Sequence, residues 1–66
     1  MDKFLITGRG WVRGMEVRGE YTTWQQAFSA WKAMLPDCAS LTLWRVSEDG
    51  KRKQVPGYGV RRNRSN

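Results

Sequence analysis

The residues best suited to chemistry in this chain are basic, and most of them lie in its last third. The net charge is +6, and residues 45–66 hold seven lysines and arginines against two acidic residues, so five of the six net charges fall there. Two runs carry most of this charge: Lys51, Arg52 and Lys53, followed by Arg61, Arg62 and Arg64. Clustered ammonium and guanidinium groups bind phosphates, so these runs predict a surface for nucleic acid or for an acidic protein. The alternative is a solvated hairpin tip followed by a tail that only aids solubility.

A second candidate contact is a tryptophan set between two arginines. Trp11 lies between Arg9 and Arg13 in a segment that glycines punctuate, residues 8–14. We predict that this segment is a loop and that it exposes the indole. An exposed ring beside arginines fits base stacking and phosphate contact, and it equally fits a hot spot for a protein partner. The alternative is an indole that folds back over the helix or over the edge of the sheet.

The chain lacks the residue types that the usual catalytic and zinc sites need. The chain has no histidine and one cysteine, Cys38. An imidazole base for a serine or cysteine nucleophile is therefore absent, as is a zinc site of the usual cysteine and histidine kind. Glu16 and Glu20 flank Arg18 at a spacing of two, which is typical of cross-strand ion pairing rather than of a catalytic carboxylate pair. We predict no enzyme activity, no metal and no cofactor.

The element that must position these residues is one amphipathic helix. Thr22 and Thr23 each precede a glutamine by three residues, which is the spacing of a helix-capping box. Apolar residues then recur at spacings of three and four until Pro36 stops the run. The stripe consists of Trp24, Ala27, Phe28, Trp31, Met34 and Leu35. We predict a helix over residues 24–35, with Trp24 and Trp31 in the core.

Four segments have the alternation or the composition of strands, and they predict two hairpins. The segments are residues 3–7, 15–21, 41–46 and 51–55. The Asp-Gly pair at residues 49–50 suits a two-residue hairpin loop. Such a loop would place Val46 opposite Lys53, and Trp44 opposite Val55. We expect Pro56 either to end the last strand or to mark it as an edge strand.

The order of these elements predicts an α+β fold. Strand, strand, helix, strand, strand is typical of an antiparallel sheet that carries the helix on one face. We predict a single domain over residues 1–60, in which a sheet of three to four strands packs on the helix. Residues 61–66 are polar and basic, and we expect them to form a disordered tail.

The uncovered face of the sheet is where a binding surface would form. We expect it to carry Arg18, Arg45 and Arg52 together with one or more tryptophans. The strand over residues 41–46 leaves its own orientation open, because two leucines compete with Trp44 and a valine for the buried side.

The whole chain predicts a small non-enzymatic accessory protein that binds DNA or RNA. No stretch approaches the roughly 20 apolar residues of a membrane span, and the apolar run near the N-terminus is too short for a signal peptide. We therefore expect a cytoplasmic monomer or homodimer without membrane contact. Its size and charge are typical of phage and plasmid accessory proteins, an analogy of character only. The alternative is a protein-binding module, such as a small inhibitor or adaptor of a host protein.

Overall fold

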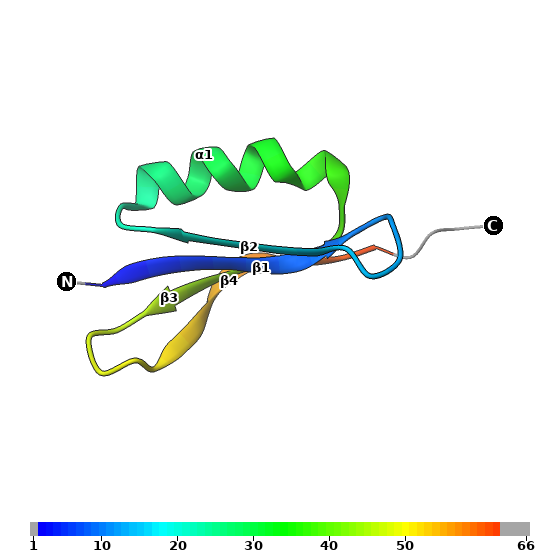
Figure 1. Ribbon diagram of the computed structural model, residues 1–66. Coiled ribbons are helices and arrows are strands. Elements are labelled where there is room, and N and C mark those ends of the chain that lie inside the picture. Colours follow the sequence, from blue (N-terminus) through cyan, green and yellow to red (C-terminus); the bar gives the residue numbers. More distant parts are fainter. Residues whose placement is uncertain (1, 63–66) are drawn as a thin grey trace.

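A four-stranded antiparallel sheet carries one helix on one of its faces (Figure 1). The computed structural model describes residues 2–62. Its elements are β1 (Lys3–Gly10), β2 (Glu16–Tyr21), α1 (Trp24–Met34), η1 (Leu35–Asp37), β3 (Cys38–Val46) and β4 (Arg52–Arg61). The strands lie in the order β2-β1-β3-β4. The predicted α+β fold, with its β-β-α-β-β order, is confirmed. Among the described residues, neither helical segment has the length and apolar character that crossing a bilayer requires.

Helix α1 begins where the sequence predicts, because Thr23 caps it. The Thr23 hydroxyl oxygen accepts a 3.2 Å hydrogen bond from the Gln26 amide. This bond satisfies one of the donors that the first turn of a helix leaves unpaired. The helix ends at Met34, and Pro36 lies in the 3-10 turn η1 that follows. The predicted helix over residues 24–35 is therefore confirmed to within one residue.

The core lies between α1 and the central strands β1 and β3. Ile6, Leu41 and Leu43 are fully buried there, and Trp31 packs on them from the helix with 5% of its surface exposed. Side chains alternate along a strand, so burial of the two leucines turns Trp44 toward the uncovered face. The sequence left open which side of this strand is buried, and in the structure it is the side that carries the two leucines.

Trp24 is outside this core, contrary to the prediction from the helix stripe. It is 41% exposed, and Phe28 is 37% exposed. The two rings stack on each other with centroids 6.0 Å apart, because residues four apart lie on the same side of a helix. Trp24 meets Tyr58 of the edge strand β4 at 5.3 Å between ring centroids. Tyr58 lies equally close to the buried Trp31, at 5.3 Å between ring centroids, so the exposed pair adjoins the core through this tyrosine.

The hairpin between β3 and β4 has a different register from the one predicted. Trp44 lies opposite Gln54, and Val46 lies opposite Arg52. The loop spans residues 48–50, and the residues on either side of it are joined by a 2.9 Å backbone hydrogen bond. Its last residue is a glycine with φ +86°, as in hairpins with three-residue loops. The loop is one residue longer than the Asp-Gly pair, so both predicted cross-strand pairs are wrong by one residue.

Strand β4 continues past Pro56 and lies at the edge of the sheet, so of the two expectations for this proline the edge strand is confirmed and the strand end is wrong. The partners of β3 change from Gln54 to Gly59, so residues 55–58 bulge opposite a single residue of β3. Pro56 has no amide hydrogen for the ladder, and Gly57 adopts φ +83°. The bulge takes both residues out of the ladder, and the strand then pairs with β3 again.

The end of β4 holds two residues that the sequence assigns to a disordered tail. Arg61 is the last residue of the strand and lies opposite Ser40. The Arg62 amide donates a 2.7 Å hydrogen bond to the Ala39 carbonyl. The sheet therefore orders both arginines. The rest of the predicted tail, including Arg64, lies outside the described residues.

Strand β1 also extends beyond its predicted end, and Arg9 is a strand residue rather than a loop residue. The register places Arg9, Arg18 and Arg52 on the face that α1 leaves uncovered. Arg45 was expected on that face and lies on the other one, because it follows the buried Leu43 by two residues.

Candidate nucleic-acid interface

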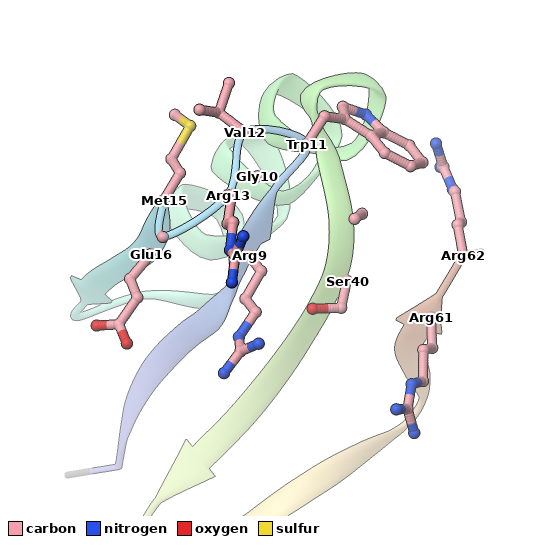
Figure 2. Close-up of a pocket in the computed structure, with 12 residues that line it drawn as sticks. Arg9, Gly10, Trp11, Val12, Arg13, Met15, Glu16, Ser40, Arg61 and Arg62 are labelled. Carbon is pink, nitrogen blue, oxygen red and sulfur yellow. The ribbon is translucent and has the colours of Figure 1, made fainter. Parts of the chain in front are cut away.

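Four arginines from two distant parts of the chain surround one hollow at an end of the sheet (Figure 2). Arg9 and Arg13 come from the end of β1 and the turn after it, and Arg61 and Arg62 come from the end of β4. They meet because only β3 separates β1 from β4. Ser40 of β3 lies opposite Arg9 on one side and opposite Arg61 on the other. The hollow has a volume of about 540 Å³, and we call these four residues the arginine end.

The turn between β1 and β2 has a closed backbone that presents Arg13. Two backbone hydrogen bonds of 3.0 and 3.1 Å involve Met15 and close the turn. Gly14 adopts φ +83°, which residues with a side chain rarely do. Figure 2 shows the side chains of Arg9 and Arg13 extending to the same side of the turn. The local sequence therefore fixes the backbone from which both guanidinium groups project.

Trp11 forms one wall of the hollow and is less exposed than predicted. It is half-buried, and its Nε1–H donates a long hydrogen bond of 3.5 Å to the Pro36 carbonyl. The indole thus turns back toward η1, which agrees with the alternative of a ring folded over its own domain. The side chain of Arg62 extends toward the ring (Figure 2).

The hollow at the arginine end is lined by the four arginines and one carboxylate, Glu16, which lies opposite Arg9 on the neighbouring strand. Within residues 2–62, none of the four arginines makes an ion pair or a side-chain hydrogen bond to another residue. By contrast, the Arg45 Nε lies 2.7 Å from the Asp2 carboxylate. All four arginines are exposed, so their guanidinium groups are available to an anion from solution.

The second predicted basic group lies at the opposite end of the sheet (Figure 1). Arg52 is opposite Val46, which is six residues along β3 from Ser40, or about 20 Å of strand. Lys53 points to the helix side, because neighbouring side chains alternate. Lys51 belongs to the turn before β4. The predicted site residues therefore form two separate groups, and Arg64 lies outside the described residues.

The sequence analysis missed a polar track on the uncovered face. Thr7 and Thr42 lie opposite each other there, next to the pair formed by Arg9 and Ser40. Two further hollows, of about 370 and 570 Å³, share Arg9 and Ser40 with the first one. The alternation of hydroxyl and leucine side chains over residues 40–43 is the signal for this track. The predicted strand over residues 41–46 begins one residue after Ser40, so it did not place that hydroxyl on the same face as Thr42.

Cys38 lies opposite Gly10, close to the arginine end, and is 3% exposed. Burial raises the pKa of its thiol above the ordinary value, and Asp37 raises it further, while Arg62 lowers it. A buried thiol whose pKa is raised is a poor nucleophile. Among the described residues, no three histidine, cysteine, aspartate or glutamate side chains are grouped so that they could hold a metal ion.

Comparisons with protein families, with curated proteins and with solved structures found no protein to which this chain is significantly similar.

Proposed function

We propose that the protein is a non-enzymatic nucleic-acid-binding protein of the cytoplasm and that the arginine end contacts phosphates. The observation that carries this proposal is the meeting of Arg9, Arg13, Arg61 and Arg62 around one hollow. Within the described part of the chain these residues have no ion-pair partner. Like charges held close together repel one another, and an anion bound between them relieves the repulsion.

A nucleic-acid backbone suits this surface better than a small anion does. The hollow of about 540 Å³ shares Arg9 and Ser40 with two further hollows. A chain of phosphates contacts several arginines in succession and releases a counterion at each contact. Planar guanidinium groups also match phosphate oxygens in paired hydrogen bonds.

A salt series with two charge-matched variants tests the proposal. Binding of the wild type to duplex DNA and to single-stranded RNA is measured at increasing salt. The double variant Arg61→Ala/Arg62→Ala removes two charges from the arginine end, and Lys51→Ala/Lys53→Ala removes two charges from the opposite end. The logarithm of the binding constant should fall linearly with the logarithm of the salt concentration. On duplex DNA the slope should be about −0.9 for each phosphate contacted.

The two variants should differ although their net charges are equal. We expect the first to bind more weakly and its salt slope on duplex DNA to fall by up to about 1.8, or two phosphate contacts. The second should stay close to the wild type. Equal weakening in both variants would mean that only net charge matters and would contradict the site. If neither duplex DNA nor single-stranded RNA binds at low salt, the proposal is overturned. An acidic protein surface would then be the expected partner of the arginines.

A second candidate function, a protein-binding module, is favoured by one observation. Trp24 and Phe28 are 41% and 37% exposed and stack on each other beside the sheet. Exposed aromatic rings are typical of interface hot spots. An interaction that survives nuclease treatment and is lost in Trp24→Ala/Phe28→Ala would support this candidate. An interaction that nuclease abolishes would support nucleic-acid binding.

A further inference from the structure

The face of the sheet that α1 leaves uncovered has an ordered pattern of side chains. The first cross-strand row, at the arginine end, contains Glu16, Arg9, Ser40 and Arg61. The second row contains Arg18, Thr7, Thr42 and Gly59. Arginines thus stand on β2, β1 and β4, around hydroxyl groups on the two central strands. The track starts at the arginine end and runs along the strands.

Trp44 stands in the third row of this track. It lies opposite Leu5, which is 5% exposed although it belongs to the uncovered face. The Trp44 Nε1–H donates a 2.9 Å hydrogen bond to the Thr7 hydroxyl on the neighbouring strand. The indole therefore reaches toward β1, with its polar atom satisfied.

An arginine side chain lies over the Trp44 ring. The Arg52 Cζ lies 5.2 Å from the centroid of the ring. This stacking of a planar cation on an indole uses the same surface that a nucleobase uses. Arg52 is itself exposed, so its side chain is free to leave the ring and turn to a phosphate.

We propose that the bound nucleic acid is single-stranded and that one of its bases stacks on Trp44 in place of the Arg52 guanidinium. This inference rests on the proposed function, because Arg9, Arg18 and Arg61 hold the phosphates of the same strand. Ser40 and Trp44 are four residues apart on β3, so the track from the arginine end to the ring is about 13 Å long. A duplex offers no free base face to the indole, since each of its bases is already stacked and paired.

The test compares a short oligothymidylate with a DNA duplex of the same length. The variant Trp44→Leu removes the stacking surface, and Trp44→Phe keeps an aromatic plane without the Nε1–H. We expect Trp44→Leu to lose about tenfold in affinity for the single strand and to keep its affinity for the duplex. Trp44→Phe should retain most of the single-strand affinity. Lys53→Ala, next to Arg52 on the other face, is the matched control and should bind the single strand like the wild type.

Tryptophan fluorescence gives a second readout that does not depend on the leucine variant folding. Stacking should quench the indole when oligothymidylate binds, and Trp44→Phe should lack that part of the quenching. Unchanged quenching in Trp44→Phe, or equal losses on single strand and duplex in Trp44→Leu, would overturn the inference. If arginine variants weaken binding while the Trp44 variants do not, this inference fails and the proposed function stands. If neither nucleic acid binds at low salt, the proposed function fails as well.

Discussion

The Arg62 amide donates a 2.7 Å hydrogen bond to the Ala39 carbonyl, which ties the end of β4 to the start of β3. The bond places a cation one residue beyond the strand, close enough to Cys38 to lower the pKa of its thiol. Burial and Asp37 act in the opposite direction and prevail, so the pKa of Cys38 is raised. The thiol therefore reports on the geometry of the arginine end.

We predict that Cys38 reacts slowly with a disulfide reagent at neutral pH in the native protein and faster after unfolding. A raised pKa leaves less thiolate at a given pH, and burial blocks access. In Arg62→Ala the influence that lowers this pKa is lost, so the midpoint of the pH–rate profile should move to higher pH. Arg61→Ala is the control and should leave the midpoint in place. A midpoint that moves to lower pH in Arg62→Ala would contradict the assignment.

Gly8→Ala should both destabilise the protein and weaken the binding of oligonucleotides at the arginine end. A β-carbon at Gly8 would overlap the Ser40 carbonyl oxygen, so the backbones of β1 and β3 must separate. Overpacking of this kind costs about 1–3 kcal/mol. The separation would also displace Arg9 from Ser40, its partner across the strands. Urea unfolding and oligonucleotide binding measure the two effects.

Gly19→Ala provides the matched control for that substitution. A β-carbon at Gly19 would meet the end of the Tyr21 side chain, which moves more easily than a backbone carbonyl. We expect a smaller loss of stability and unchanged binding. Equal losses in the two variants would show that close packing at Gly8 is not what holds the two strands together.

Local signals in the sequence were enough to predict the elements and the fold class. Thr23 and the apolar spacing predicted α1 because capping and amphipathicity act within a few residues. The hairpin register was wrong because the Asp-Gly pair also fits a three-residue loop, in which Ser47 and Lys51 form the closing pair. A bulge at Pro56 let β4 continue, which a pattern of alternation does not reveal.

The candidate site was harder to predict than the fold because it depends on strand order. The neighbours of Arg9 and of Arg61 in the sequence each predict a phosphate contact. Their meeting requires β3 to lie between β1 and β4, with Ser40 in register with both. Strand order is set by packing over the whole domain, so no local pattern predicts that these two arginines share a hollow.

Thr23→Ala should lower the free energy of unfolding by about 1 kcal/mol, the usual effect of losing a helix N-cap. The substitution removes the acceptor of the 3.2 Å hydrogen bond from the Gln26 amide. Thr22→Ala is the control, because the Thr22 hydroxyl donates only to the exposed Gln26 side chain. It should change stability by no more than about 0.5 kcal/mol. Urea unfolding followed by circular dichroism measures both, and equal losses would mean that Thr23 is not the cap.

The loop between β3 and β4 should contribute stability that is lost in acid. The Asp49 carboxylate accepts hydrogen bonds from the Ser47 hydroxyl and from the Lys51 amide, and these hold the pKa of Asp49 below its ordinary value. A group with a depressed pKa in the folded state stabilises the fold above its unfolded pKa of about 3.9. That contribution disappears as the pH falls through the lower folded pKa.

The free energy of unfolding of the wild type and of Asp49→Ala, measured across this pH range, gives the contribution of the carboxylate. The difference in free energy between the two proteins should be largest near neutral pH and should shrink in acid. Ser47→Ala removes the largest cause of the depressed pKa. In this variant a titration of the Asp49 carboxylate by NMR should show the pKa returning toward its ordinary value. A pKa in Ser47→Ala equal to that of the wild type would mean that the Lys51 amide, and not the serine hydroxyl, controls the charge of this loop.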